Sequence, residues 1–182
     1  MNRAKKDGKK VLKEDFFRRS SLEVAEGLLG KFLAGRIAGK EISFRITETE
    51  AYGGPEDLAS HASRGETPRN KIMWEEGGVF YIYLVYGVHY MINIVTGKKG
   101  YPSAVLIRGV EEAEGPGRVA RLFKADKNLN GKKVSPETGL WIEEEEENGG
   151  KRKIIIKKTP RIGVDYAGPV WSKKLYRFLI ER

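Results

Sequence analysis

The chain has no cysteine and only two histidines, His61 and His89, in 182 residues. Without thiols it forms no disulfide and offers neither a thiolate metal site nor a cysteine nucleophile, as is usual for an intracellular protein. Two histidines are too few to predict a zinc site. We therefore expect neither a metal nor any other cofactor.

Long apolar segments are also missing. No run approaches the roughly 20 residues that a membrane-spanning helix needs. Residues 1–13 are basic but are followed by no apolar stretch, so they do not predict a secretory signal. We expect a protein of the cytoplasm or nucleoid, or of the nucleus in a eukaryote, that is not secreted and contacts no membrane.

Positive charge is in excess. The formal net charge is +9 and the pI is about 9.6. This excess is typical of proteins that bind polyanions, because each neutralised phosphate releases counterions. The alternative is a lysine-rich surface that serves solubility or thermal stability. Residues 1–19 hold many of the basic side chains, and we expect them to form a mobile arm before one domain at 20–182.

Capping and turn residues predict the elements of this domain. Ser20 and Glu23 have capping-box spacing for a helix over 20–30, and Pro116 suits the start of a helix over 115–123. Short helices are expected after Pro55 and Pro68. Strands are expected at 32–37, 41–52, 79–95 with a break at Gly87, 103–110, 140–147, 151–158, 161–164 and 175–180.

These elements predict an α+β fold: a mostly antiparallel curved sheet with short peripheral helices and a protruding tyrosine-tipped hairpin. The glutamates of 143–147 are expected to face Lys151, Arg152 and Lys153 across a solvated hairpin, as charge partners rather than metal ligands.

Residues 41–52 combine a strand pattern with carboxylates. Strand alternation places Ile46, Glu48, Glu50 and Tyr52 on one face, so an apolar row leads directly into two acids and a ring. Carboxylates on a core-facing row are costly unless paired and concentrate at functional sites. The alternative is a bulge near Thr47 that turns both glutamates outward.

Residues 79–93 are rich in tyrosine. Tyr81 and Tyr83 share a strand face, and Tyr86-Gly87 lies where the chain reverses. Aromatic rings in a basic protein are suited to stacking on bases, and a ring at a hairpin tip could act as a wedge between base pairs. The alternative is a tyrosine-rich strand buried in the core.

The segment 61–70 runs from His61 through a charged loop to Pro68, and such a loop could hold a phosphate at a helix N-terminus. His61 could equally be a structural residue with its hydrogen bonds satisfied.

Taken together, these segments resemble the alkyladenine (3-methyladenine) DNA glycosylase family. The resemblance is collinear from about Leu22 to Phe178, and it is specific because the pieces keep their order and spacing. It departs at Trp74, where phenylalanine is expected, and in the longer link at 169–174. The matching segments are 45–52, 54–57, His61, 67–70, 81–83, 86–87, 91–93, 105–108, 115–118 and 161–164.

The resemblance implies catalytic roles. Glu50 would be the general base that activates a water against the anomeric carbon. Arg108 and the backbone carbonyl of Ile162 would help to hold that water. The implied enzyme is a monofunctional glycosylase of base excision repair that extrudes an alkylated or deaminated purine, hypoxanthine included, from duplex DNA.

The resemblance also implies a base pocket. Tyr52, His61 and Tyr83 would sandwich the extruded purine, with the His61 backbone amide donating to its six-position, and Tyr81 would support the wall. Asn93 would lie at the floor, where the exocyclic amine of normal guanine clashes. Tyr86 would fill the gap left in the duplex. We expect a monomer that contacts double-stranded DNA through its minor groove and phosphates.

Three other functions are considered. A non-catalytic nucleic-acid-binding module would need no inward carboxylate such as Glu50. A bifunctional glycosylase/lyase would need an amine in the pocket, and the nearest lysine in sequence, Lys71, matches no pocket position. A basic protein with an unrelated small-molecule pocket leaves the order of the motifs unexplained.

Overall fold

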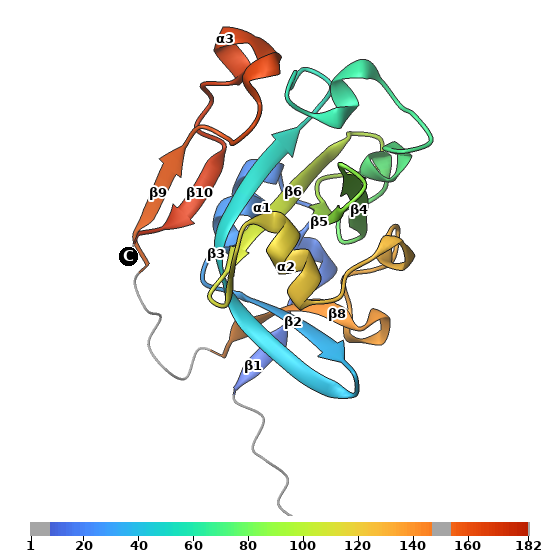
Figure 1. The fold of residues 1–182 in the computed structure, drawn as a ribbon, viewed down its shortest axis with the longest axis vertical. Coiled ribbons are helices and arrows are strands. Elements are labelled where there is room, and N and C mark those ends of the chain that lie inside the picture. The colour runs from blue at the N-terminus through green and yellow to red at the C-terminus, as the bar shows by residue number, and fades with distance from the viewer. Residues whose placement is uncertain (1–7, 147–153, 182) are drawn as a thin grey trace, which may run out of the picture.

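The computed structural model describes residues 8–146 and 154–181. Figure 1 shows a curled sheet with short helices around it. Hydrogen-bonded neighbours follow the order β1-β8-β2-β3-β6-β5-β4, while β10 pairs with β3 and β9, and β7 pairs with β6. The strands are β1 (Lys9–Val11), β2 (Phe32–Ile37), β3 (Lys40–Gly53), β4 (Phe80–Val85), β5 (His89–Val95), β6 (Ser103–Val110), β7 (Ala113–Glu114), β8 (Leu140–Glu145), β9 (Ile156–Thr159) and β10 (Arg177–Ile180).

Helices are few and short. The α-helices are α1 (Ser21–Leu28), α2 (Pro116–Leu122) and α3 (Gly168–Trp171). The 3-10 turns are η1 (Glu14–Phe16), η2 (His61–Arg64), η3 (Lys71–Trp74), η4 (Lys127–Leu129), η5 (Pro136–Thr138) and η6 (Asp165–Ala167). Since all strand pairs among the described residues are antiparallel, the predicted α+β class with a mostly antiparallel sheet is confirmed. No helix in these two ranges is long and apolar enough to cross a membrane.

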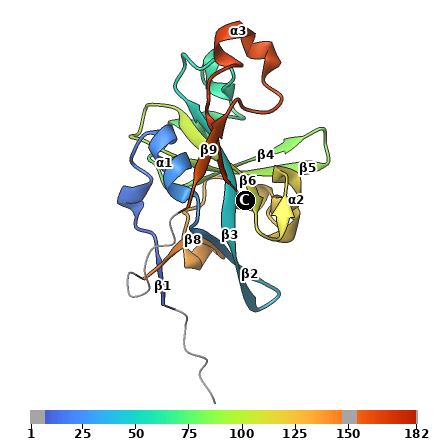
Figure 2. The same cartoon turned by 90° about the vertical axis from the view of Figure 1, so that its left-hand side faces the viewer.

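The two longer helices begin where the sequence predicts. Ser20 and Glu23 form the reciprocal hydrogen bonds of a capping box before α1, and Pro116 opens α2. Figure 2 shows α1 and α2 on opposite sides of β3. Val24 and Leu28 of α1 and Val119 of α2 belong to one fully buried apolar cluster. Both helices therefore pack on the sheet through this cluster.

A bulge in β3 changes which side chains face the core. Pairing with β6 shifts in register between Ile46 and Thr49. Ile46 is buried in the apolar cluster before the bulge, whereas Thr49 takes the core side after it and donates to the Ala25 carbonyl at 2.8 Å. The prediction that Ile46 and Glu50 share a face is therefore wrong. Glu50 is nonetheless fully buried, because other elements cover the face to which the bulge turns it.

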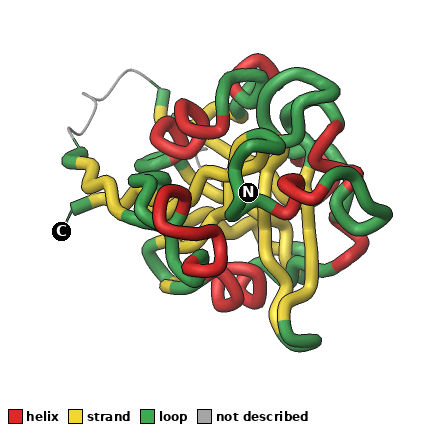
Figure 3. Tube along the Cα trace, turned by 90° about the horizontal axis from the view of Figure 1, so that it is seen from above, coloured by secondary structure: helices red, strands yellow, loops and turns green. Residues whose placement is uncertain are grey.

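The tyrosine-rich segment forms the predicted hairpin. β4 and β5 pair from Phe80–Ile94 to Val85–His89 and leave residues 86–88 as the loop. Tyr86 and Gly87 both have positive φ, of 50° and 70°. Figure 3 shows this hairpin projecting from the body of the molecule.

Other expected elements differ from the structure. β8 lies between β1 and β2, and β9 pairs only with β10 among the described strands, so β8 and β9 form no hairpin. Glu144 instead pairs with Lys10 and Lys31, and Glu145 with Arg45. The partners expected for these glutamates, residues 151–153, lie outside the described residues. No helix begins at Pro55 or Pro68: turns follow each proline, and η2 and η3 begin only at His61 and Lys71. Residues 161–164 form a loop.

Part of the expected N-terminal arm is packed on the sheet. β1 pairs with β8, and Leu12 and Phe17 enter the apolar cluster, with Phe17 only 1% exposed. Lys10 of β1 pairs with Glu144 of β8, and the Lys9 ammonium donates to Ser43 Oγ of β3 at 3.4 Å, so both basic side chains have partners on the sheet. Residues 1–7 of the expected arm lie outside the described residues.

Candidate active site

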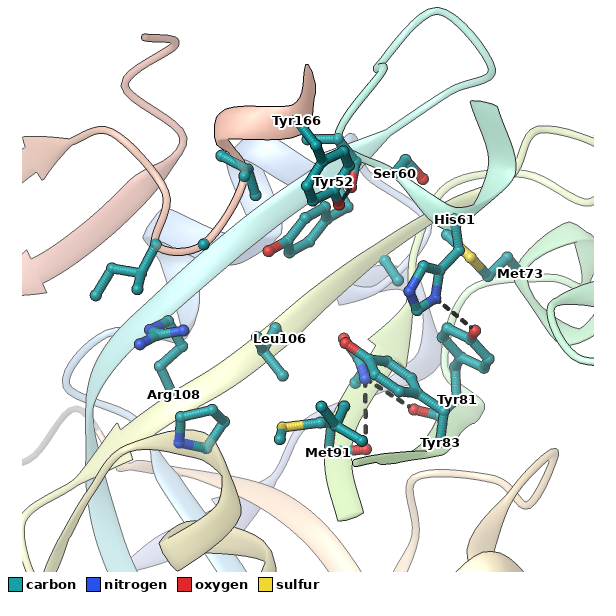
Figure 4. Close-up of a pocket in the computed structure, with 18 of the residues that line it drawn as sticks. Tyr52, Ser60, His61, Met73, Tyr81, Tyr83, Met91, Leu106, Arg108 and Tyr166 are labelled. Atoms are coloured by element: carbon teal, nitrogen blue, oxygen red, sulfur yellow. Dashed lines mark hydrogen bonds between the residues drawn. The ribbon is translucent and has the colours of Figure 1, made fainter. Parts of the chain in front are cut away.

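A cavity of about 310 Å³ opens between β3 and β6 on one side and β4, β5 and η2 on the other. Figure 4 shows Tyr52 and Arg108 on the β3–β6 side and His61 across from them. This volume falls at the small end of ligand pockets. The lining includes Tyr52, Ser60, His61, Met73, Tyr81, Tyr83, Tyr86, Met91, Asn93, Leu106, Arg108, Ile162 and Tyr166.

One wall is an aromatic cluster. The rings of His61 and Tyr83 lie 4.7 Å apart between centroids, and those of Tyr81 and Tyr83 lie 5.2 Å apart. Tyr81 is 2% exposed and supports the other two rings from behind. A flat aromatic ligand placed in the cavity would lie between this wall and Tyr52.

The hydroxyl of Tyr81 holds the ring of His61. It lies 2.9 Å from His61 Nδ1, and the two atoms share one hydrogen bond. Burial raises the pKa of Tyr81 well above its ordinary value, so the phenol keeps its proton. Partial burial, with the positive charge of Arg69, lowers the pKa of His61. The imidazole is consequently neutral near neutral pH, and the Tyr81 hydroxyl orients it.

Glu50 lies directly behind the lining of the cavity and is fully buried. Its carboxylate accepts hydrogen bonds from the Tyr52 hydroxyl at 2.7 Å and the Ile162 backbone N–H at 2.8 Å. Arg108 Nε is 3.5 Å from Glu50 Oε1. Burial raises the pKa of Glu50, and the three polar neighbours oppose that rise. The result is a carboxylate that is held in place yet is a stronger base than an exposed one.

A buried ion pair anchors the loop that carries Ile162. Arg161 donates from both Nη atoms to Asp57, at 2.5 and 2.8 Å, and one of them also donates to the Ala51 carbonyl. Both side chains of the pair are 0% exposed. The pair therefore fixes the chain immediately before Ile162 against β3. Sequence reasoning missed it, although both residues lie in the segments that carry the resemblance.

Asn93 lines the cavity and is 3% exposed. Its side-chain nitrogen donates to the carbonyls of Tyr81 and Met91, at 3.1 and 3.4 Å. Asn93 thus combines a position in the cavity lining with hydrogen bonds to strand backbone.

Tyr86 stands apart from these buried groups. It lies at the rim, at the tip of the hairpin, and is 93% exposed. Tyr166 lies on another part of the rim, is 68% exposed, and donates to the Ala59 carbonyl at 2.9 Å. Sequence reasoning missed Tyr166 because it follows the segment 161–164 outside any matched motif.

Comparisons with known proteins agree with this geometry. The family described as methylpurine-DNA glycosylase (MPG) matches residues 15–182. The chain belongs to this family. Its relatives include proteins named "Putative 3-methyladenine DNA glycosylase" from Methanocella arvoryzae (40% identical, covering 87% of this chain and 86% of the relative), Anaeromyxobacter sp. strain Fw109-5 (40%, covering 93% and 89%) and Legionella pneumophila strain Corby (40%, covering 93% and 94%).

Membership of the methylpurine-DNA glycosylase family confirms the resemblance recognised in the sequence. The family activity is that of a DNA glycosylase, a hydrolase that acts on N-glycosyl bonds during repair of DNA damage, with DNA as the substrate. Glu50 is a fully buried carboxylate that accepts hydrogen bonds from two residues of the cavity lining, Tyr52 and Ile162.

Proposed function

We propose that this methylpurine-DNA glycosylase is monofunctional: it extrudes an alkylated or deaminated purine from duplex DNA and hydrolyses the N-glycosidic bond with a water that Glu50 activates. The observation that carries the proposal is the fully buried Glu50 carboxylate, held by Tyr52 and the Ile162 amide behind an aromatic-lined cavity. The enzyme would act inside the cell, without a metal or lyase step.

The chemistry needs one proton acceptor close to the sugar. Glu50 takes a proton from water while the water oxygen forms its bond to the anomeric carbon, and the purine leaves with the electrons of the broken glycosidic bond. An alkylated purine is cationic and leaves readily. The raised pKa of Glu50 favours this role, because a stronger base accepts the water proton more readily. Arg108 and the Ile162 carbonyl are proposed to orient the water.

The cavity suits a purine that has left the base stack. Its faces would contact Tyr52 on one side and His61 with Tyr83 on the other, and π-faces attract a cationic ring. The backbone amide of His61 is proposed to donate to the six-position of the base. Burial and Arg69 keep the imidazole of His61 neutral near neutral pH, so this ring adds no positive charge against an alkylated base, and the Tyr81 hydroxyl orients it.

DNA would reach this pocket from its minor groove. The exposed ring of Tyr86 is proposed to fill the space left by the extruded nucleotide. Side chains of the basic surface would contact the DNA phosphates. The protein would bind DNA and release the base as a monomer.

Base release tests the proposal directly. Duplexes that carry an alkylated adenine, an alkylated guanine or hypoxanthine are incubated with the protein, and alkali then converts abasic sites into strand breaks. We expect breaks that require alkali and persist in a chelator, and we expect Glu50→Gln to abolish them while binding to an abasic-site analogue stays nearly intact.

Each other result identifies a different function. Binding without base release by the wild type would mean a non-catalytic nucleic-acid-binding module. Borohydride trapping of a covalent protein–DNA adduct would mean a lyase. Full activity of Glu50→Gln would move the general base to another residue, with Glu48 the first to test.

A further inference from the structure

Glu48 occupies a second carboxylate position beside the site, and the chemistry proposed above does not use it. Its atom Oε1 accepts hydrogen bonds from Arg108 Nε at 2.8 Å and from Arg177 Nε at 2.6 Å. Arg108 belongs to β6 and Arg177 to β10, so one oxygen joins the two strands that flank β3. The Glu48 side chain is 14% exposed, and the two arginines are 13% and 21% exposed.

The backbone is shaped to bring Glu48 to this position. The bulge in β3 sets Glu48 opposite Gly109 of β6. A Cβ added at Gly109 would lie 3.0 Å from Thr47 Oγ1 and 3.1 Å from Glu48 Cβ, which is tighter than ordinary contact. The absence of a side chain at Gly109 therefore lets Glu48 approach β6 and reach Arg108.

Glu48 and Glu50 compete for one hydrogen of Arg108. The Nε–H donates to Glu48 at 2.8 Å, whereas the same nitrogen is 3.5 Å from Glu50 Oε1, beyond a normal hydrogen bond of this type. Glu50 Oε1 instead accepts from the Ile162 amide. Within the described parts of the chain, the Nη atoms of Arg108 have no hydrogen-bond partner, so they remain available to a ligand in the cavity.

We propose that Glu48 is a positioning residue: it binds the Nε–H of Arg108 and so holds the guanidinium beside Glu50 without letting the two form a full ion pair. A full pair would neutralise the carboxylate and weaken it as a base. This inference rests on the proposed role of Glu50 as general base.

Several charged and titratable groups face Glu50. Tyr52 of β3 donates to it, Arg108 approaches from β6, and Arg177 of β10 stands opposite it in the strand register. The charge of Glu50 in turn raises the pKa of Tyr83, Arg161 and Tyr166. Among them, Arg108 lowers the pKa of Glu50, and the negative charge of Glu48 raises it.

The variant Glu48→Gln removes that negative charge and weakens the hold on Arg108, because a neutral amide oxygen accepts the Nε–H less strongly than a carboxylate oxygen and Glu50 then competes better for it. We expect the pKa of Glu50 to fall by about 1 pH unit, the size typical of one nearby charge. Because the ionised base is the active form, the acid limb of the excision rate moves to lower pH. At pH values above the acid limb, the excision rate falls by about tenfold, because displacement of a group that acts in the reaction, here the Arg108 guanidinium, lowers the rate by that factor or more.

The experiment compares wild type, Glu48→Gln, Glu48→Asp and Glu144→Gln. Glu144 is a matched control because its carboxylate also bridges two cations, Lys10 and Lys31, but on β8, away from the cavity. Single-turnover excision is measured against pH. In parallel, a ¹³C titration follows the side-chain carboxyl carbon of Glu50, identified by its loss in Glu50→Gln. Thermal unfolding of each variant checks the fold.

The two readouts separate the inference from the proposed function. The inference is supported if the Glu50 titration and the acid limb of the excision rate both move in Glu48→Gln. The shift should be smaller in Glu48→Asp and absent in Glu144→Gln. An unmoved Glu50 titration in folded Glu48→Gln or, if that variant does not fold, in Glu48→Asp overturns it, whatever the rate. The proposed function is overturned instead if the wild type releases no base or if Glu50→Gln is active. The two failures can be told apart because the carboxyl titration is measured without catalysis.

Discussion

The hydroxyl of Tyr52 donates a hydrogen bond of 2.7 Å to the carboxylate of Glu50, two residues earlier on the same face of β3. Burial and the neighbouring carboxylate raise the pKa of Tyr52 well above its ordinary value, so the phenol stays protonated and remains a donor. Its hydrogen bond stabilises the ionised form of Glu50, whereas burial disfavours it. Tyr52 would thus both contact the purine and keep the general base usable near neutral pH.

This relationship predicts the pH dependence of base release. The folded pKa of Glu50 is raised, so excision is lost as pH falls through a value above that of an ordinary glutamate. Tyr52→Phe removes an interaction that lowers this pKa, so we expect the acid limb to move to higher pH. Single-turnover rates measured from acid to neutral pH test both expectations.

A suitable control is Tyr101→Phe. Tyr101 donates to Glu56 at 2.6 Å, so this variant also removes a tyrosine–glutamate hydrogen bond, but outside the cavity lining. Its acid limb should coincide with that of the wild type. If Tyr52→Phe moved the limb to lower pH or left it unmoved, the hydrogen bond would not stabilise the ionised Glu50.

A second prediction concerns the buried pair Asp57–Arg161. Asp57→Asn leaves the guanidinium charge in the protein interior, and breaking such a pair costs about 3–5 kcal/mol of stability. Excision should also fall, because Arg161 fixes the chain next to the Ile162 amide. Denaturant unfolding measures the first effect and single-turnover excision the second.

The matched variant for stability is Glu14→Gln. Glu14 pairs with Lys133 at 2.7 Å on the surface, and such pairs contribute about 0–1 kcal/mol. Equal losses of stability in Asp57→Asn and Glu14→Gln would show that the buried pair does not anchor this loop.

The sequence predicted local features well. The capping box at Ser20, the proline start of α2 and the reversal at Gly87 depend on residues close together in the chain, so their physical causes are visible there. The aromatic and carboxylate motifs also came together: Tyr52 and Tyr83 line one cavity, and Tyr52 donates to Glu50 behind that lining.

Long-range pairing was less predictable. Alternation placed Ile46 and Glu50 on one face, but a bulge depends on the partner strand, and Gly109 makes room for it from β6. The glutamates of β8 could form ion pairs with any basic strand. The sequence alone does not show whether their partners are the nearby residues 151–153 or the distant Lys10. The Asp57–Arg161 pair was missed for the same reason, because 104 positions separate its members.

A third prediction concerns the hairpin tip. Tyr86→Ala should leave stability almost unchanged, because the side chain is 93% exposed. Binding to lesion duplexes should weaken by about tenfold, since a stacked aromatic ring contributes about 1–3 kcal/mol. Val88→Ala is the control at the same tip, where the side chain is 68% exposed but carries no ring. Equal affinities of Tyr86→Ala and wild type in a fluorescence titration would exclude the wedge role.

The last prediction concerns Asn93 and the choice between normal guanine and hypoxanthine. These bases differ only by the two-amino group of guanine, so a pocket that separates them must reject that group by a clash or an unpaired polar contact. The hydrogen bonds from Asn93 to the carbonyls of Tyr81 and Met91 hold its amide at the cavity wall. A fixed amide can exclude a ligand group that a mobile one would accommodate.

Asn93→Ser shortens this side chain and removes its bonds to the strand. We expect release of undamaged guanine to rise relative to hypoxanthine, above all from mismatches, where extrusion is easiest. The lost hydrogen bonds also destabilise the fold by about 1 kcal/mol. Asn130→Ser controls for that loss, because Asn130 accepts from the Ile82 amide at 2.9 Å and does not line the cavity.

Guanine and hypoxanthine release, measured side by side with a melting curve for each variant, separates pocket discrimination from stability. If Asn93 only supports the strand, Asn93→Ser and Asn130→Ser lose both activities in proportion to their loss of stability, and the ratio of guanine to hypoxanthine release stays at the wild-type value. A ratio that rises in Asn93→Ser alone requires contact between this side chain and the two-position of the base. That outcome would place the minor-groove edge of the extruded purine against the β4–β5 hairpin, with Tyr52 and Tyr83 over its two faces.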